Sequence, residues 1–465
     1  MNRTSDAATG NVLDAAQTLR EQVGPDLHDR ITESIYAQAA RVAERSIRQT
    51  DRRPVDWDLF ADRILTSRLF GFPIMIVGLA VVLWLTISGA NAPSAVLFDA
   101  LFWVHDRWEA WMIAAGAPWW LTGFLVNGVY RGLAWVVAVM LPPMAIFFPI
   151  FTLLEDVGYL PRIAFNVDRL FRACGAHGKQ ALTMTMGFGC NAAGVTACRI
   201  IDSPRERLIA ILTNNFTLCN GRWPTIIMLA TVFIVGAFPP GWSSVIATAA
   251  VVSVTLLGVC VTFAVSKLLS RTVLKGEPSH FYLELPPYRR PSVLRVIYRS
   301  LVDRTVFVLG RACLTAAPAG GLIWILGNVH VGGVTLMAHM TGWLDPAAAL
   351  IGLDGVILVA YLVALPANEI VVPTMIMAYM ASGKMIELED MAQLGGLFHA
   401  HGWTLTTAAC MMLFSLLHFP CGTTSWTIYR ETGSWRWTAL ANLMPLTLAV
   451  VVCATVAQTV RLFGG

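Results

Sequence analysis

Long apolar runs alternate along this chain with short segments rich in arginine. An apolar run of about 20 residues can cross a bilayer as a helix, and glycine, proline or polar residues inside such a run predict a broken or re-entrant helix. The pattern therefore predicts an all-α, polytopic membrane protein of about eight or nine spans. The predicted runs cover residues 70–90, 132–154, 180–198, 208–221, 223–266 (divided at 239–241), 305–327, 354–384, 402–429 and 437–460.

Amphipathic and aromatic segments flank these runs. Apolar residues recur every fourth position between Pro25 and Arg48, which predicts an amphipathic helix after a disordered or loosely helical stretch at 1–24. Seven arginines between Arg41 and Arg68 place the N-terminus in the cytoplasm by the positive-inside rule. Five tryptophans within 93–127 predict interfacial helices on the outer surface. The expected divisions are 1–60 (tail and amphipathic helix), 61–266 (first membrane half), 267–304 (basic cytoplasmic loop) and 305–465 (second membrane half).

Composition strengthens the membrane assignment. Of 465 residues, 56% are hydrophobic and 13% charged, whereas about a quarter of the residues of a soluble domain are charged. The nine cysteines include no Cys-x-x-Cys pair and lie mostly in apolar runs, which argues against a disulfide framework and a structural zinc site. The first 30 residues have no apolar core and do not form a signal peptide.

Two interrupted runs are candidates for a transport site. The first contains Gly187, Gly189 and Gly194 around Cys190-Asn191, and the second contains Glu369 between Pro366 and Pro373. Transporters place such paired interruptions at the midplane, where unwound backbone and nearby side chains form the binding site. A carboxylate in the membrane is a functional candidate, although Glu369 could instead cap a half-helix. The two interrupted runs predict an internal repeat.

Thiols and amides mark the other interruptions. Cys219-Asn220 precedes Gly221, and Cys421 lies between Pro420 and Gly422. Thiolate, imidazole and carboxylate are ligands that a divalent transition metal accepts, so these breaks predict a metal pathway. Further candidates are Asn368, the thioethers of Met184 and Met186 (alternatively packing), Glu155 and Asp156 (alternatively helix caps), His399 and His401, and His105 with Asp106 on the outer surface.

The sequence lacks the common catalytic motifs. It contains no Gly-x-Ser-x-Gly, no His-Glu-x-x-His and no G-x-x-x-x-G-K-[ST] phosphate loop, so we expect neither an enzyme nor a nucleotide site in this chain. The basic loop at 267–304 is the flanking charge that a membrane protein requires and predicts no nucleic-acid partner.

Several motifs together resemble the membrane region of the FeoB ferrous iron transporters. They are Asp62-Arg63-Ile64-Leu65, Gly71-Phe72-Pro73-Ile74, Glu155-Asp156-Val157-Gly158-Tyr159, Gly187-Phe188-Gly189-Cys190-Asn191, Cys219, Glu284-Leu285-Pro286-Pro287-Tyr288-Arg289, Pro420-Cys421 and Arg430-Glu431-Thr432-Gly433-Ser434-Trp435. The resemblance extends over about residues 25–460. It departs at Ala192, where the family has proline, and at Asn368, where the family has lysine beside the glutamate.

The resemblance implies Fe(II) as the transported ion and the inner membrane as the location. The family's N-terminal GTPase domain is missing from this sequence, so a separate small GTPase and a small cytoplasmic accessory protein are the expected partners besides the lipid bilayer. A homo-oligomer is left open. Two alternatives also stay open at this stage: a transporter of another divalent metal or a small solute, and a non-transporting membrane scaffold with the same fold.

Overall fold

The computed structural model describes residues 18, 27–46, 57–67, 69–234, 243–276, 287–289, 291–385 and 391–463, which are almost wholly helical. The predicted turn at 239–241 and nearly all of the 1–24 stretch lie outside them. Two compact units are present: residues 1–61 with 280–282, and residues 62–279 with 283–465. In the first unit, α2 (Leu27–Ser46) confirms the predicted amphipathic helix. The expected division of the chain into four segments stays a prediction.

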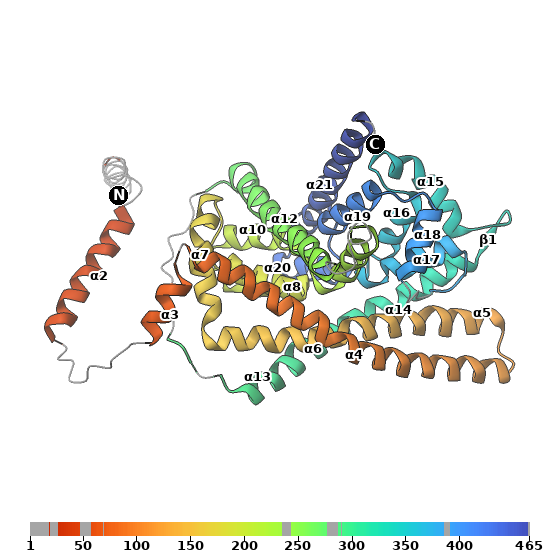
Figure 1. The fold of residues 1–465 in the computed structure, drawn as a ribbon, viewed down its shortest axis with the longest axis horizontal. Helices are drawn as coiled ribbons and strands as arrows, with labels where there is room; N and C mark the ends of the chain where they lie inside the picture. The colour runs from red at the N-terminus through yellow and green to blue at the C-terminus, as the bar shows by residue number, and fades with distance from the viewer. Residues whose placement is uncertain are drawn as a thin grey trace, which may run out of the picture. The chain divides into compact units, whose positions relative to one another are not determined.

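Long apolar helices form the frame of the second unit (Figure 1). Within the described ranges, six helices are long and apolar enough to cross a membrane, and a bent pair raises the number to seven. This confirms a polytopic helical membrane protein. The count is lower than eight or nine because several predicted spans consist of half-helices that are individually too short. Five of the six include α4 (Gly71–Ala114), α6 (Arg131–Val157), α12 (Ser243–Arg271), α14 (Phe307–Asn328) and α21 (Trp435–Leu462), and the sixth runs over Leu405–Thr432.

The predicted interfacial helices over 93–127 are wrong. The 44-residue helix α4 continues through Pro93 to Ala114. The returning chain is also continuous, from α5 (Trp119–Thr122) through the π-helix η1 (Gly123–Tyr130) into α6. At 1.5 Å per residue, α4 is about 66 Å long, roughly twice the hydrocarbon thickness. Packing against α6 stabilises α4 on both sides of Pro93, so α4 stays helical there. The five tryptophans therefore belong to the extended ends of α4 and of the α5–α6 helix.

Two interrupted runs fold as re-entrant hairpins whose ends are tied together. The first consists of α8 (Gln180–Gly189) and α9 (Asn191–Ala197), and the chain leaves it on the side where it entered. Its two ends are joined by Lys179 Nζ, which donates to Ile200 O at 3.0 Å and to the Asp202 carboxylate at 2.9 Å. In the second, α16 (Gly355–Val363) leads through η9 (Asn368–Ile370) into α17 (Val371–Met380), and Tyr379 OH donates to the Asp354 carboxylate.

The two hairpins break with the same backbone geometry. Cys190 has φ −152° and ψ 125°, and Ala367 has φ −151° and ψ 118°. Each is the extended residue that immediately precedes an asparagine at the start of the second half-helix. The matched break supports the internal repeat that the sequence predicted.

Two further helices are broken in mid-course. The first is α10 (Pro204–Thr213), η3 (Asn214–Phe216), η4 (Asn220–Arg222), α11 (Trp223–Leu229) and the π-helix η5 (Ala230–Ile234). The second is α19 (Leu405–Leu417) and α20 (Gly422–Thr432), which confirms the break predicted around Pro420. The remaining elements are α3 (Trp57–Leu65), α7 (Tyr159–Ala173), η2 (Cys198–Ile200), α13 (Val293–Arg299), η8 (Ser300–Val306), β1 (His330–Val331), β2 (Val334–Thr335), α15 (Leu336–Leu350) and α18 (Met391–Ala400).

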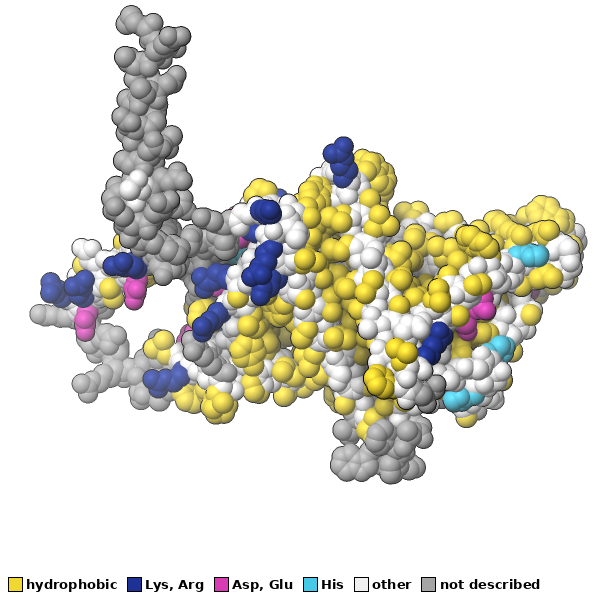
Figure 2. All heavy atoms as spheres, turned by 90° about the horizontal axis from the view of Figure 1, so that it is seen from above, with side chains coloured by type: hydrophobic (Ala, Val, Ile, Leu, Met, Phe, Trp, Pro, Cys, Tyr) yellow, Lys and Arg dark blue, Asp and Glu magenta, His cyan; other side chains and the backbone are white. Residues whose placement is uncertain are grey.

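Polar contacts lie at two ends of the second unit, with an apolar surface between them. At one end, Arg199 pairs with Glu431 at 2.7 Å, and Arg205 Nε donates to Leu274 O at 2.6 Å. At the other, Arg461 Nη2 donates to Ala349 O at 2.7 Å. Figure 2 shows a broad hydrophobic face between them, with most Lys and Arg side chains of this unit toward the end where α7 and α10 lie. This is the charge distribution of a protein embedded in a bilayer.

A buried arginine joins three segments at the first end. Arg162 on α7 donates from Nε to Asp62 Oδ1 at 2.9 Å and from Nη1 to Gly158 O at 2.7 Å. Tyr288 OH donates to the same Asp62 oxygen at 2.7 Å, and the guanidinium lies 4.0 Å from the Tyr288 ring centre. Burial raises the pKa of Asp62, but the hydrogen bonds from Arg162 and Tyr288 outweigh it and hold this pKa below its ordinary value of 3.8.

We expect Asp62→Ala to lower the free energy of unfolding by about 3 kcal/mol, because it leaves the buried Arg162 charge without its carboxylate. The Asp62 pKa is lowered on folding, so this contribution is present at neutral pH and is lost as the pH falls below 3.8 toward the folded-state value. Denaturant titration of the purified protein at several pH values measures it. Asp99→Asn, an exposed aspartate of α4, is the control; equal losses in both variants would contradict the assignment.

Candidate metal site within the membrane helices

One small cavity collects residues from all four helix breaks. Its volume is about 40 Å³, enough for an ion with a water molecule. The residues predicted as ligands that line it are Cys190, Asn191, Cys219, Asn368, Glu369 and Cys421. These positions are up to 231 residues apart in the sequence (190 to 421). We call this space the central cavity. Whether its residues bind metal stays a prediction.

The three cysteines occupy equivalent local positions. Each lies in extended backbone directly before a helical turn: Cys190 before α9, Cys219 (φ −81°, ψ 164°) before η4, and Cys421 (φ −62°, ψ 160°) before α20. The free N–H groups of a helix start favour negative charge nearby. A negative charge on any of these sulfur atoms would therefore be stabilised by the backbone.

Hydrogen bonds hold the breaks against one another. Gly422 N donates to Leu365 O at 2.7 Å, which joins the Cys421 break to the second hairpin. Asn214 Nδ2 donates to Asn191 O at 3.0 Å, which joins the first hairpin to the α10 break. The Asn191 side-chain amide, oriented so that its nitrogen faces acceptors, donates to Thr217 O at 3.1 Å and to Gly187 O at 3.2 Å. The tip of each hairpin is thus fixed by a neighbouring broken helix.

The glycines of the first hairpin serve close packing. A Cβ on Gly194 would lie 2.6 Å from Asn214 Oδ1, and one on Gly189 would lie 2.6 Å from the Phe147 ring. Gly187 is similarly close to Asn214, at 3.0 Å. These contacts leave no room for a side chain where the half-helices meet their neighbours. The role of these glycines as hinges stays a prediction.

Arg222 is the buried charge beside the cavity that sequence reasoning missed. Its Nη1 donates to Asn215 O at 2.9 Å and to Leu416 O at 3.0 Å, and its Nη2 donates to Asn215 Oδ1 at 2.9 Å and to Phe419 O at 3.2 Å. The carbonyls that end α19 thereby receive donors from the α10–α11 break. A signal was available, because Arg222 is the only charged residue between Leu208 and Ser266.

Glu369 reaches the cavity because Gly221 has no side chain. A Cβ on Gly221 would overlap the Glu369 carboxylate. Asn368 and Pro366 line the same space, whereas Pro373 is buried within α17. Asn220 is buried beside Cys219 but is not part of the lining.

Several of the further candidate residues lie away from the central cavity. Met184 is buried in an apolar cluster with Phe171 and Ile209, and Met186 packs against the main core, so neither lines the central cavity. The cavity is lined instead by the thioethers of Met140 and Met144, which lie four residues apart on one face of α6. His399 and His401 are exposed at the end of α18, and Glu155 and Asp156 are exposed at the end of α6. The structure does not bring these four residues to the cavity.

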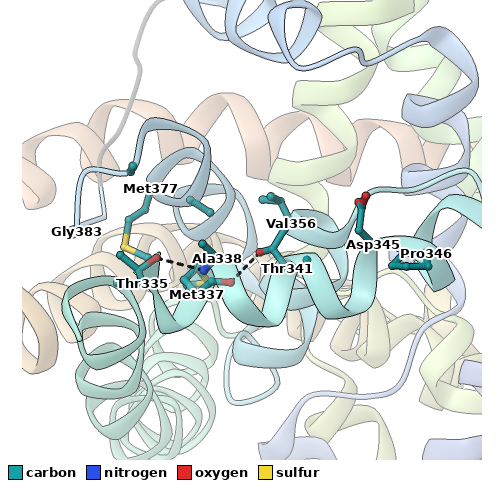
Figure 3. A pocket seen from close by; sticks show the side chains of 13 residues that line it. Thr335, Met337, Ala338, Thr341, Asp345, Pro346, Val356, Met377 and Gly383 are labelled. Carbon is teal, nitrogen blue, oxygen red and sulfur yellow. Dashed lines mark hydrogen bonds between the residues drawn. The ribbon is translucent and has the colours of Figure 1, made fainter. Parts of the chain in front are cut away.

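A larger pocket lies between α14, α15, α16 and α17 (Figure 3). Its volume is about 480 Å³, which suits a small organic molecule. The polar side chains in its wall are already committed: Thr335 accepts from Ala338 N, Thr341 donates to Met337 O, and Asp345 accepts from Gly355 N. The pocket therefore offers a polar solute few free hydrogen-bonding groups.

Comparison with known sequences gives two family matches. Residues 137–233 and 309–435 match the Gate family, described as "Nucleoside recognition", and residues 251–303 match "Ferrous iron transport protein B C terminus". The first match covers both hairpins and all four breaks. These matches support the resemblance drawn from the motifs.

Individual relatives agree. The chain is 30% identical over 414 residues to an Fe(2+) transporter FeoB of Staphylococcus aureus, covering 86% of this chain and 59% of the relative. It is 29% identical over 394 residues to the Synechocystis Fe(2+) transporter FeoB, covering 83% and 61%. A Porphyromonas gingivalis Fe(2+) transport protein A/Fe(2+) transporter FeoB fusion protein is 26% identical over 478 residues, covering 92% and 55%. The chain thus spans somewhat more than half the length of these relatives.

Gly221→Ala tests the close approach of Glu369. We expect it to lower stability by about 1–3 kcal/mol, because the new methyl group overlaps the carboxylate and displaces the second hairpin. Thermal denaturation in detergent measures the loss. Gly396→Ala is the matched control, since nothing lies within 4 Å of its Cβ position. The loss should shrink in a Glu369→Ala background; the same loss in both backgrounds would show that the contact is not responsible.

Proposed function

We propose that this chain, whose sequence matches the membrane region of the FeoB family, carries ferrous iron across the cytoplasmic membrane through the central cavity. The observation that supports this most is the convergence of three thiols and one carboxylate, from four separate helix breaks, on a space of about 40 Å³. The names of the relatives, Fe(2+) transporter FeoB, agree with this cargo.

The donor set suits an ion of intermediate softness. Thiolate and thioether ligands select against hard ions such as Mg²⁺, while a carboxylate and amide oxygens keep the site accessible to Fe(II). A midplane site formed by four broken helices can open toward either side by small movements of one hairpin against the other. The central cavity would then hold the ion during passage, with Cys190 and Glu369 contributed by opposite hairpins.

Control by GTP would come from outside these 465 residues, whose sequence contains no phosphate loop. The surfaces we propose for docking a GTPase and a small accessory protein are α2 and the basic loop at 267–304. The Porphyromonas relative, by its name, joins an Fe(2+) transport protein A to FeoB, which supports an accessory partner. The arginines that precede α4 favour a cytoplasmic N-terminus. Uptake in cells with and without a co-expressed GTPase tests this arrangement.

The central cavity is too small to hold a nucleoside, although the Gate family is described as "Nucleoside recognition". Pockets for small organic molecules are typically about 300–1,000 Å³, and the central cavity is far smaller. Another divalent metal is the stronger alternative, and competition of iron uptake by Mn²⁺, Zn²⁺ and Co²⁺ separates the two. A scaffold without transport activity predicts no flux in liposomes.

Cys190→Ser and Cys219→Ser test the thiolate route. We expect each to reduce anaerobic Fe(II) uptake into proteoliposomes by about tenfold or more, because a hydroxyl is a poorer ligand for this ion than a thiolate. Cys260→Ser, an exposed thiol of α12, is the matched control and should retain full uptake. Wild-type rates in both cavity variants would rule out the thiolate route.

A further inference from the structure

A cluster of candidate metal ligands lies on α4, which contributes no residue to the lining of the central cavity. In the described part of the chain, His105, Asp106 and Glu109 bring one ligand atom each to within 4.8 Å of one another. First-row metals hold N and O ligands at about 2.0–2.2 Å, so atoms of one coordination sphere lie within roughly 4.4 Å of each other. The three groups are therefore close to the spacing of a single metal site.

The cluster lies near the C-terminal end of α4. His105 is 34 residues after Gly71, where α4 begins, so it lies about 50 Å along the helix. This is well beyond the roughly 30 Å of a bilayer core. The opposite end of the helix faces the Asp62–Arg162–Tyr288 junction. A bilayer that α4 crosses from its Gly71 end would therefore separate the cluster from that junction.

Both ring nitrogens of His105 face oxygen atoms of neighbouring side chains. His105 Nδ1 faces an Asp106 carboxylate oxygen at 2.9 Å, and its Nε2 faces Asn127 Oδ1 at 3.2 Å. The Asn127 orientation is set because its Nδ2 donates to Glu109 Oε1 at 2.7 Å. Both ring nitrogens thus face acceptors, but a neutral imidazole has only one N–H. A cation shared by Nδ1 and the Asp106 oxygen would satisfy the first contact while Nε2–H donates to Asn127.

The site is built into the fold. His105 is 2% exposed while its neighbour Asp106 is 78% exposed, so the imidazole is fixed and the carboxylate is open to solvent. Asn127 comes from the π-helix η1, a rare form that frequently occurs at functional sites. The neighbouring cation, Arg131, lies over the Phe102 ring at 5.2 Å. It forms no ion pair with the cluster among the residues described, although its charge interacts with those of Glu109 and Asp106.

We infer that His105, Asp106 and Glu109 bind a divalent transition-metal ion on the outer side, with Asn127 as the partner that orients the cluster. An imidazole with two carboxylates suits Fe(II) and its neighbours in the first row. The role of this site rests on the proposed transport function: it captures the ion from solution and raises the concentration of the ion near the entrance of the pathway. The sequence already suggested His105 and Asp106; the fold adds Glu109 and Asn127.

Equilibrium dialysis of the purified full-length chain against Fe(II) alone, without oxygen, tests the inference. We expect His105→Ala/Glu109→Gln to lower the number of bound ions by one, and Asn127→Ala to weaken that ion about tenfold. Asp106→Asn, at a position that is 78% exposed, should weaken it as well. The control His330→Ala/Asp99→Asn removes exposed groups of the same types and should bind as wild type does.

The outcomes separate this site from the proposed function. If binding depends on His105 and Glu109 but proteoliposomes show no Fe(II) flux, the outer site stands and the transport proposal fails. If Cys190→Ser/Cys219→Ser loses flux while the His105 and Glu109 variants bind as many ions as wild type, with the same affinity, the outer site is wrong.

Discussion

The arrangement of the membrane helices depends on the buried guanidinium of Arg222. Four helices break inside the membrane, and each break frees backbone carbonyls that lipid cannot satisfy. Arg222 supplies donors to Leu416 O and Phe419 O at the end of α19 and to Asn215 at the end of α10. Because one side chain serves both breaks, Cys219 and Cys421 are brought to the same cavity. Removing it would leave several buried acceptors unpaired, each costing about 1–3 kcal/mol.

The hairpins complete the cavity from both sides. Each is tied at its base, by Lys179 with Asp202 and by Tyr379 with Asp354, and each breaks at a residue with nearly the same φ and ψ. The repeat is not chemically symmetric, since Cys190 corresponds to Ala367 and Glu369 follows Asn368. One hairpin thus contributes a thiol and the other a carboxylate. Such a mixed site can accept an ion of intermediate softness without binding it as tightly as a full thiolate shell would.

Much of this could be predicted from the sequence because lipid imposes strict rules on composition. Apolar runs predicted the spans. Glycines or prolines in the sequence around Cys190, Glu369 and Cys421 predicted the breaks. Local pattern could not show that α8–α9 and α16–α17 return to the side from which they enter, because this depends on contacts at their bases. It also misassigned residues 93–127, where tertiary packing extends α4 past Pro93. Met140 and Met144 flank Pro142-Pro143, but they were missed because methionine in an apolar run ordinarily indicates packing and α6 continues through both prolines.

We propose that the four helix breaks form one thiolate-containing metal site. The most direct measurement is a titration of the purified protein with Co²⁺, a spectroscopic substitute for Fe(II), while absorption from thiolate-to-metal charge transfer is recorded. We expect a charge-transfer band in the wild type and in Cys260→Ser, and a weaker or absent band in Cys190→Ser, Cys219→Ser and Cys421→Ser. A wild-type protein that shows no such band, or cavity variants that keep it undiminished, would contradict the claim.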